Sequence, residues 1–556
     1  MLPSQYRKTH IQLSESEKQI EDQSNNIDTQ LISYLHNYEV SDILIKYSKP
    51  SIKKIEFELI DTNHKKRRLK HNYKKIFPNC DSATLLYSNM QQYIKIFQQE
   101  IHFSYIYLSE IFREEIGIYT EHSTSNEIYN FRKIDIIINF LLSINLKPII
   151  DLGQLPSSLS DSLNKVEYPM AITRWRNLIK NTIVHFIDQY GLTEVETWQF
   201  YTSIKLINLP SSLNQPDFCF FYYETYKTVK LCNPKLSFGS SPLEYISYST
   251  NNSLVKFYEF CSNYNCHPDF IHFIHYPTVP VLENENYIQK KHSVELHLNT
   301  VINNIKKYLN QIGWDKKPLY LCEWGSTRYK SKLLNDTIFN AAYITHTVLQ
   351  NYDSLDGYSY CNFVDLPFHQ YQISNCFYGD TGLITHNGIS KASYKAFTLL
   401  NHLGNYLIYK NQGCFITREN NKIKGVLYNY KHSVINFLDL LSKEQEKVSV
   451  PVSGHINYPS DTMEGQAIKY DIPLSGLSYG KYYLIEIILN SEFGSSFEKW
   501  KALGEYPFLH EYDIAYLNQI SIMELLRKEI HTNSGIFNYT REVKPYEIRY
   551  FELTPE

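Results

Sequence analysis

Residues 320–327 read Tyr320-Leu-Cys-Glu-Trp-Gly-Ser-Thr327, a short apolar run that ends in a carboxylate and is followed by Trp and small polar residues. In a (β/α)₈ barrel the strand is buried in the wall, and the residues at its carboxyl end line the mouth, where catalytic side chains stand. We therefore expect Glu323 to lie at the mouth of such a barrel, provided that the rest of the chain supplies the other strands.

Between Ile101 and Gly404 short apolar runs alternate with longer amphipathic stretches, the pattern of repeated βα units. The expected strands are Ile101–Leu108, Lys147–Leu152, Thr197–Ser203, Leu236–Ser240, Asp269–Tyr276, Leu319–Trp324 and Gly357–Phe363. An eighth, weak strand is expected between Ile118 and Phe131. Eight βα units close a barrel, whereas an open parallel sheet is the alternative, which no Gly-rich phosphate loop favours.

The sequence therefore predicts an α/β fold, a (β/α)₈ TIM barrel over residues 81–404 with a C-terminal antiparallel β-sandwich over residues 405–556. After Gly404 the helical rhythm stops and alternating runs take over, as in a sandwich, with one helical insert near Ile514–Lys528. Residues 41–80 are predicted as strands that join the sandwich, and residues 11–40 as a linker.

Charge and cysteine content exclude several classes of function. The 55 basic and 58 acidic side chains give a net charge of −3, which does not suit a chain that binds DNA by itself. The basic run at residues 64–68 is better interpreted as a solvated hairpin or loop. Nine cysteines without a Cys-x-x-Cys pair indicate reduced thiols, and neither a metal nor a cofactor is expected.

The sequence predicts a cytoplasmic protein without a membrane span. The N-terminus has no apolar signal-peptide core, and no run of about 18 apolar residues occurs. The abundance of unpaired cysteines agrees with a reducing compartment.

The second carboxylate of a glycosidase is missing from its expected place. A retaining glycosidase uses two carboxylates about 5 Å apart, one as nucleophile and one as acid/base. The fourth expected strand reads Trp198-Gln-Phe-Tyr-Thr-Ser-Ile-Lys-Leu206, without Asp or Glu. Glu196 precedes this strand, so we expect it to face the bottom of the barrel or its helices.

The chain resembles glycoside hydrolase family 39, the family of β-xylosidases and α-L-iduronidases, from about residue 40 to its end. The resemblance is carried by Phe140-Leu-Leu-Ser-Ile-Asn-Leu-Lys-Pro-Ile-Ile-Asp-Leu-Gly153, Asn387-Gly-Ile-Ser-Lys-Ala-Ser-Tyr394 and Leu474-Ser-Gly-Leu-Ser-Tyr-Gly-Lys-Tyr-Tyr483. It implies a TIM barrel followed by a β-sandwich, and it implies that Glu323, in a Glu-Trp pair, stands at the nucleophile position with Trp324 beside it.

The family's acid/base is the second Glu of a Trp-x-Phe-Glu-x-Trp-Asn-Glu-Pro run. Matching Trp198 and Phe200 to this run places Lys205 on that Glu, whereas matching Asn208 and Pro210 places Leu209 there. Neither alignment recovers a carboxylate.

The sixth strand also departs from the family's pattern. The family's Asp-Phe-x-x-x-His-x-Tyr-Pro reads Asp269-Phe-Ile-His-Phe-Ile-His-Tyr-Pro277 here, with His275 one place beyond the expected His. His275 and Tyr276, with Trp324, are the candidate sugar-binding residues, because aromatic side chains at a barrel mouth can stack on a sugar.

The first residues carry a second resemblance. Leu2-Pro-Ser-Gln-Tyr-Arg7 resembles the closing segment of an AraC/XylS-type helix-turn-helix domain, so residues 1–10 are interpreted as its remnant. Some regulators of that class carry a family-39-like domain after the DNA-binding region. DNA would then be bound only through a missing N-terminal domain.

These observations favour a catalytically degenerate glycosidase-like barrel that is the sensor or interaction part of an AraC/XylS-type regulator. A sugar ligand would bind at the barrel mouth, and a homodimer is one alternative for the oligomeric state. The competing hypothesis is an active retaining β-glycosidase, similar to β-xylosidases, with Glu323 as nucleophile and an acid from another segment. A third alternative is the product of a truncated or mis-started gene.

Overall fold

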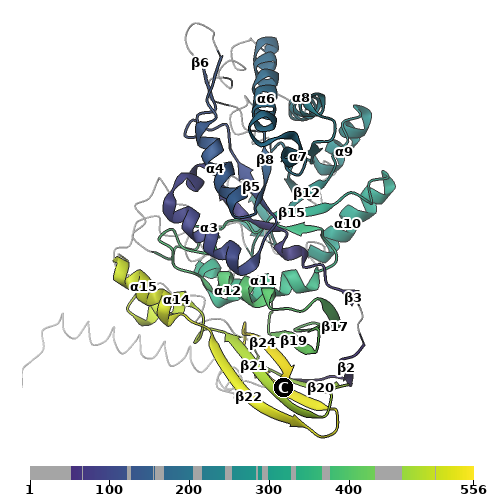
Figure 1. The fold of residues 1–556 in the computed structure, drawn as a ribbon, viewed down its shortest axis with the longest axis vertical. Coiled ribbons are helices and arrows are strands. Elements are labelled where there is room, and N and C mark those ends of the chain that lie inside the picture. The colour runs from purple at the N-terminus through teal and green to yellow at the C-terminus, as the bar shows by residue number, and fades with distance from the viewer. Residues whose placement is uncertain are drawn as a thin grey trace, which may run out of the picture. The chain divides into compact units, whose positions relative to one another are not determined.

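The structure is a computed structural model, and the chain divides into a first unit, Met1–Lys53, and a second unit, Lys54–Glu556, whose described residues Figure 1 draws as a ribbon. Nearly all described residues belong to the second unit. The structure describes residues 52–64, 67–121, 127–153, 156, 159, 168–203, 216–244, 253–277, 279–283, 286–290, 298–326, 333–365, 376–431, 466–507 and 509–556. The proposed helix-turn-helix remnant and linker, at residues 1–40, lie outside these ranges.

Parallel strands in two sheets form the wall of a barrel. One sheet has the order β10-β9-β8-β5-β4 and the other the order β11-β12-β15-β16. Their bounds are β4 Ile76–Asp81, β5 Tyr105–Ser109, β8 Lys147–Asp151, β9 Gln199–Tyr201, β10 Ser237–Phe238, β11 Leu243–Glu244, β12 Ile271–His275, β15 Leu319–Trp324 and β16 Gly357–Tyr358.

Backbone hydrogen bonds close the barrel at both junctions between the sheets. The Ser240 N–H donates to the Phe270 carbonyl at 2.9 Å next to β10 and β12. On the other side, the Asn79 N–H of β4 donates to the Tyr360 carbonyl after β16, also at 2.9 Å. The predicted α/β barrel is confirmed.

The helices surround this wall and bury their apolar stripes against it (Figure 1). In α10, for example, Val301, Ile302, Ile305 and Leu309 are buried at helical spacing. The helices of the barrel are α3 Ser88–Ile101, α4 Arg132–Ser143, α6 Tyr168–Tyr190, α7 Leu192–Val195, α8 Pro216–Cys232, α9 Ser253–Asn263, α10 Leu298–Gln311, α11 Ile338–Gln350 and α12 Ala392–Asn401. The described residues also include the 3₁₀ turns η1 Asn72–Lys74, η2 Ser82–Leu86 and η4 Leu333–Asp336.

The eighth barrel strand was predicted between Ile118 and Phe131, and this position is wrong. The segment between Ile118 and Phe131 forms a hairpin of β6 (Tyr119–Glu121) and β7 (Glu127–Tyr129) that pairs only with itself among the described strands. The eighth strand is instead β4, the first in the chain, which pairs in parallel with β5. The barrel thus begins at Ile76, before the predicted boundary at residue 81, and Ile101 ends helix α3 instead of starting a strand.

The C-terminal part is a sandwich of two sheets. The larger sheet has the order β22-β21-β24-β19-β18-β17-β3, and in the smaller sheet β20 pairs with β1, β2 and β23. The bounds are β1 Lys53–Glu56, β2 Ile60–Asp61, β3 Arg67–Arg68, β17 Tyr406–Asn411, β18 Cys414–Glu419, β19 Lys422–Tyr428, β20 Ile468–Ser475, β21 Gly480–Leu489, β22 Glu524–Thr532, β23 Phe537–Val543 and β24 Ile548–Pro555. A hairpin of β13 (Val279–Glu283) and β14 (Asn286–Lys290) stands apart from both sheets.

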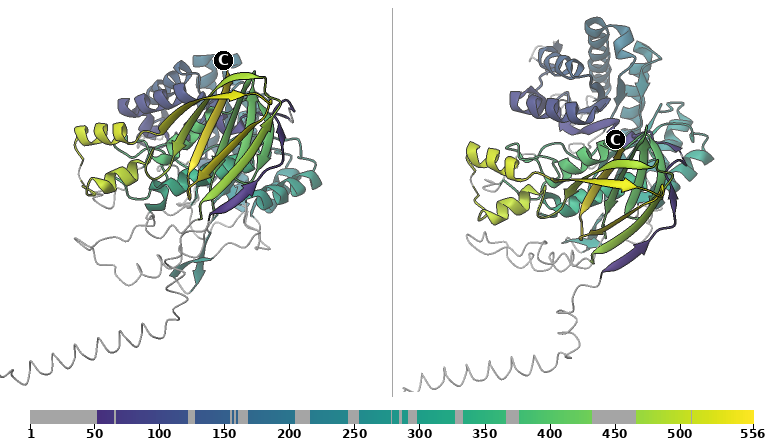
Figure 2. Two further views of the ribbon diagram at one scale, coloured as in Figure 1. Left: turned by 90° about the horizontal axis from the view of Figure 1, so that it is seen from below. Right: turned by 60° about the horizontal axis from the view of Figure 1, so that its bottom comes forward.

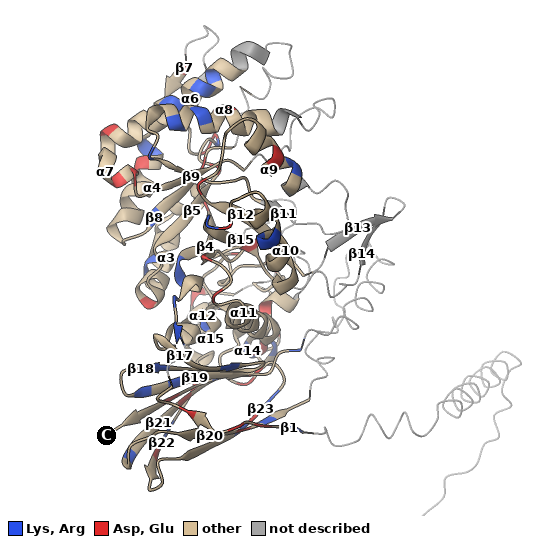
Figure 3. Ribbon diagram, turned by 90° about the vertical axis from the view of Figure 1, so that its right-hand side faces the viewer, with Lys and Arg blue, Asp and Glu red and all other residues tan. Residues whose placement is uncertain are grey.

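The sandwich includes strands from before the barrel. In the basic run, Arg67 and Arg68 form strand β3 at the edge of the larger sheet, opposite Leu407 and Tyr406, and Arg67 forms an ion pair of 2.7 Å with Asp353. Lys and Arg are interspersed with Asp and Glu along the described ribbon (Figure 3). No described helix is long and apolar enough to span a membrane.

Two helices, α14 (Ser496–Ala502) and α15 (Glu511–Ile520), interrupt the sandwich and lie beside the barrel helix α12 (Figures 1 and 2). The predicted insert near Ile514–Lys528 is therefore partly wrong, because the helix ends at Ile520 and residues from Glu524 onward form strand β22. Phe497 and Trp500 of α14 pack against Phe377 in the segment between β16 and α12.

Candidate active site

Glu323 is the penultimate residue of β15, near the carboxyl end of the seventh barrel strand, and its side chain is half-buried. In the pairing with β12 it lies opposite Ile274, a residue packed against the barrel's interior cluster. Residues that pair across parallel strands share a face, and a register shift between Phe273 and Ile274 leaves Cys322 as an extra residue before this pair. Glu323 therefore faces the inside of the barrel, near the carboxyl end of its strand.

Tyr276, just after β12, holds one oxygen of this carboxylate. The buried Tyr276 hydroxyl donates a hydrogen bond of 2.9 Å to Glu323 Oε1. Glu323 Oε2 accepts no hydrogen bond from the described part of the chain. The arrangement fixes the carboxylate through one of its two oxygens.

Trp324 points away from the mouth. Its side chain is fully buried, and its ring packs edge-on against Tyr360 at 5.3 Å and against Tyr343 of α11 at 6.0 Å. This burial leaves no ring face for a sugar, in contrast to what the sequence suggested. His275 pairs with Trp324 across the sheet and is also buried. Its side chain therefore shares the face of Trp324, away from the barrel mouth.

The fourth strand, β9, ends at Tyr201, and the described chain continues to Ser203. Lys205 and Leu209, the residues predicted at the acid/base position, lie outside the described residues. At the other end of β9, Glu196 accepts a hydrogen bond of 3.2 Å from Asn233. Glu194 accepts one of 2.9 Å from the Trp198 indole N–H. Both acids precede the strand and stand at the bottom of the barrel.

A carboxylate that the sequence analysis did not consider lies at the end of the third strand. Asp151 Oδ1 accepts hydrogen bonds of 2.8 Å from the backbone N–H groups of Gly153 and Ser203, and its Oδ2 accepts the Ser203 hydroxyl. Asp151 thus fastens the end of β9 to the end of β8. Burial raises the pKa of Tyr201 far above its ordinary value, and the negative charges of Asp151 and Glu323 add to this shift.

Below the mouth, a neutral histidine links three strands. His272 is buried, which lowers its pKa to about 3. Its Nδ1 lies 2.9 Å from the Ser240 carbonyl, which can only accept, so Nδ1 carries the proton. Nε2, 2.9 Å from the Tyr107 hydroxyl, therefore accepts. This link fills the barrel core with fixed polar groups under the candidate site.

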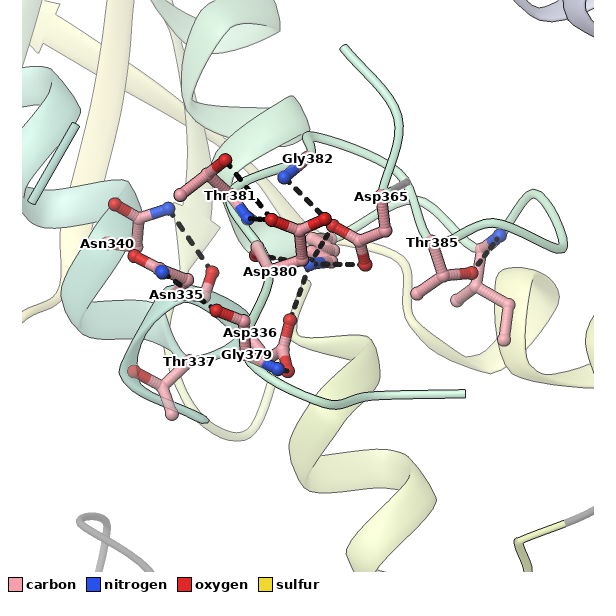
Figure 4. A network of polar contacts seen from close by, with 12 residues as sticks. Asn335, Asp336, Thr337, Asn340, Asp365, Gly379, Asp380, Thr381, Gly382 and Thr385 are labelled. Carbon is pink, nitrogen blue, oxygen red and sulfur yellow. Dashed lines mark hydrogen bonds and ion pairs between the residues drawn. The ribbon is translucent and has the colours of Figure 1, made fainter. Parts of the chain in front are cut away.

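Beside the mouth, a fully buried network joins the segments after the seventh and eighth strands (Figure 4). Lys391 forms ion pairs with Asp336 and Asp365, and all three side chains are completely buried. Burial alone would lower the pKa of Lys391, but the two carboxylates raise it above its ordinary value, so the lysine stays protonated. Burial raises the pKa of Asp365 to about 7 despite the neighbouring cation.

The family can be assigned at this point. The model of glycosyl hydrolases family 39 matches residues 55–528. The chain belongs to glycosyl hydrolase family 39. Among the residues that the structure describes, no group of three or more His, Cys, Asp or Glu could hold a metal ion.

Relatives of this family-39 chain cover most of its length. It is 26% identical to a β-xylosidase of Geobacillus stearothermophilus over 80% of this chain and 85% of the relative. It is 24% identical to a β-xylosidase of Caldicellulosiruptor saccharolyticus over 86% of this chain and 94% of the relative.

Two solved structures share the fold. A family 39 enzyme from Xanthomonas axonopodis pv. citri superposes with a TM-score of 0.74 at 18% identity, over 92% of this chain and 99% of that chain. A monomeric β-xylosidase from Caulobacter crescentus gives the same TM-score and identity over 90% of this chain and 99% of that chain.

These relatives overturn the interpretation of the chain as a catalytically degenerate sensor of an AraC/XylS-type regulator. The hypotheses of a pseudoenzyme and of a transcriptional regulator are wrong, because the chain matches named β-xylosidases over nearly their whole length. The family-39 protein is a glycoside hydrolase. The absent carboxylate on the fourth strand and the six-residue likeness at the N-terminus are local features, whereas the family match extends through both barrel and sandwich.

Proposed function

We propose that this protein is a retaining β-glycosidase that hydrolyses β-xylosides, with Glu323 as its nucleophile. The observation that carries the proposal is the hydrogen bond from Tyr276 to Glu323 Oε1, which fixes a carboxylate at the barrel mouth while Oε2 has no donor among the described residues. The β-xylosidases of Geobacillus stearothermophilus and Caldicellulosiruptor saccharolyticus support xylosides as the substrate class.

In the first step, Glu323 Oε2 attacks the anomeric carbon as the bond to the leaving oxygen breaks, which gives a covalent glycosyl-enzyme through an oxocarbenium-like transition state. The leaving oxygen takes the bonding electron pair and needs a proton unless it is stable as an anion. In the second step, water attacks the anomeric carbon, loses a proton and releases Glu323. Two inversions leave the sugar with its original anomeric configuration.

The proton supply is the distinctive feature of this chain. No Asp or Glu occurs between Thr197 and Pro216, so the fourth strand and the segment after it provide no carboxylic acid. The leaving oxygen must therefore receive its proton from a carboxylic acid elsewhere at the mouth, from a group other than a carboxylic acid, or from water. General acid assistance contributes about 10²–10⁴-fold in typical enzymes, so we expect aryl xylosides with acidic phenols to be the best substrates.

The test is hydrolysis of 2,4-dinitrophenyl and 4-nitrophenyl β-xylosides by the wild-type protein and by Glu323→Gln. We expect sustained turnover, a first product of the β configuration by NMR, and loss of at least about 10³-fold in kcat/KM for Glu323→Gln. The matched control is Glu196→Gln, at the bottom of the barrel, which should keep wild-type activity. No turnover on either substrate, or turnover unaffected by Glu323→Gln, contradicts the proposal.

A further inference from the structure

The geometry points to Lys391 as a positioning residue for Glu323: it clamps the segments after the seventh and eighth strands, and these segments hold the end of β15. This inference rests on the proposed function of Glu323 as nucleophile. It concerns a set of residues that does not touch the carboxylate and that the chemistry above does not use.

The clamp is built around one buried cation. Lys391 is the N-cap of α12, and its Nζ donates to Asp365 Oδ1 at 2.8 Å and to the Asp380 carbonyl at 3.0 Å. The same ammonium lies 2.5 Å from Asp336 Oδ1 in η4. One side chain therefore ties the helix after the eighth strand to the segments that follow both the seventh and the eighth strands.

Each carboxylate of the clamp also holds backbone of the segment after β16. Asp336 Oδ2 accepts the Gly379 N–H at 2.7 Å, and Asp365 Oδ1 accepts the Gly382 N–H at 2.8 Å. At Gly382 the backbone approaches so closely that an added Cβ would lie 2.3 Å from the Asp365 nitrogen. The segment from Gly379 to Gly382 is thus held tightly against the lysine.

A first route leads from this segment to β15. The Asn335 side-chain amide donates to the Gly379 carbonyl at 2.9 Å. Its oxygen accepts a hydrogen bond of 2.9 Å from the hydroxyl of Ser326, a buried residue three positions after Glu323. The position of the clamp is therefore transmitted to the chain just beyond the nucleophile.

A second route reaches Trp324. Asn340 donates to the Asn335 carbonyl at 3.2 Å and to the Tyr360 hydroxyl at 2.9 Å. The Tyr360 ring packs edge-on against Trp324. The Cys361 N–H, one residue later, donates to the Trp324 carbonyl at 3.1 Å. The residue next to Glu323 is thus held by both its ring and its backbone.

Two routes from one buried cation to Trp324 and Ser326, which both follow Glu323, are a means of holding a carboxylate in a reactive position. A displacement of about 1 Å of a reacting group can reduce a rate by about 10²-fold, even when the mutation is remote. Removing the charge of Lys391 leaves two buried carboxylates without their cation, which forces the two segments to rearrange. Xyloside binding does not involve Lys391, so the effect should appear in kcat.

The experiment compares Lys391→Met and Asn335→Ala with Lys395→Met as the matched control. Lys395 is also a buried lysine of α12, but it donates to the carbonyls of Gly494 and Ser521, away from the mouth segments. For every variant, kcat and KM are measured on 4-nitrophenyl β-xyloside, and kcat is expressed per folded molecule. The rate of covalent labelling by a 2-deoxy-2-fluoro-xylosyl fluoride is measured as well. Hydrogen exchange of a peptide over residues 319–326 is measured in parallel.

We expect Lys391→Met and Asn335→Ala to lower kcat and the labelling rate by about 10–100-fold, with KM within about twofold, and to speed exchange in residues 319–326. Lys391→Arg should recover part of kcat, and Lys395→Met should change the melting temperature without changing kcat. If Lys391→Met does not fold, Asn335→Ala decides. Wild-type kcat and exchange in Asn335→Ala, or an equal loss of kcat in Lys395→Met, overturn the inference. If the wild-type protein neither turns over nor is labelled, the proposed function fails, and exchange still tests the clamp.

Discussion

The Tyr276 hydroxyl lies 2.9 Å from Glu323 Oε1, so a residue of the sixth strand region holds the carboxylate of the seventh strand. This bond orients Glu323 without occupying the oxygen proposed to attack. The pair is separated by 47 positions in the sequence and meets only because β12 and β15 are neighbours in the barrel.

We expect Tyr276→Phe to lower kcat/KM on aryl xylosides by about 10–100-fold, because the loss of a hydrogen bond to a charged group weakens the positioning of Glu323. The melting temperature should change little. Tyr308→Phe, which removes a peripheral hydroxyl of α10, is the matched control and should keep wild-type kinetics. Equal kinetics for Tyr276→Phe and wild type would contradict this assignment.

The rate should depend steeply on the leaving group. With no carboxylic acid on the fourth strand, phenols of low pKa should leave fastest, and kcat/KM should fall by about 10²-fold or more from 2,4-dinitrophenyl to 4-methoxyphenyl β-xyloside. A plot of log kcat/KM against the pKa of the phenol measures this slope. A flat plot would show that another group delivers the proton efficiently.

Asp151→Asn should separate the ends of β8 and β9. The amide nitrogen cannot accept a hydrogen bond, so the Ser203 hydroxyl can keep its contact only as an acceptor, and all three hydrogen bonds lose their charged acceptor. We expect a decrease in kcat/KM of about tenfold and a destabilisation of about 1–3 kcal/mol. Kinetics and urea unfolding measure the two effects, and an unchanged protein would mean that this link is dispensable.

Stability should rise with pH because of Lys395. Burial lowers the pKa of this lysine to about 7, whereas in the unfolded chain it is about 10.4. Between these values the unfolded state binds more protons, so the free energy of unfolding contributed by this residue rises with pH by up to about 1.4 kcal/mol per pH unit. The urea concentration at the midpoint of unfolding should therefore rise for the wild type relative to Lys395→Met between pH 7 and pH 9. A difference in midpoint that stays constant over this range is the contrary result.

The sandwich should be sensitive to the loss of Glu486. Its buried carboxylate accepts two hydrogen bonds from Arg541 and one of 2.7 Å from Tyr539, and it forms an ion pair with Arg549. Breaking a buried pair costs about 3–5 kcal/mol, so Glu486→Leu should lower stability by that amount. Activity of the remaining folded protein should be unchanged. Lys422→Leu, which breaks the more exposed pair with Glu552, is the comparison and should cost about 1 kcal/mol or less.

The sequence predicts best those strands whose hydrophobic pattern is regular and which end at a recognisable polar residue or turn. The apolar run before Glu323 has the burial expected of a barrel strand, and the alternation in Lys481–Ile487 belongs to β21. The first barrel strand was missed because β4 contains Pro78 and follows a run of lysines, which are typical of edges and turns. The segment near Ile128 has strand residues but pairs locally as a hairpin.

The candidate site was less predictable because it depends on pairing between distant segments. Asp336, Asp365 and Lys391 come together only through the closed barrel, and their types and spacing in the sequence show no motif. Trp324 was expected at the mouth beside Glu323, but alternation along a strand turns its ring to the opposite face. Asp151 carried no sequence signal apart from its place at the end of an apolar run.

The pairing of β3 with β17 has a consequence for synthesis. Arg68 leaves the ribosome early, yet its partner Tyr406 is made about 340 residues later, roughly 20–70 s at ordinary elongation rates. The sandwich cannot close until the barrel between these strands has been translated. Strand β3 therefore has no partner from β17 while the barrel is being translated. A nascent chain halted before Tyr406 should expose this strand to chaperones.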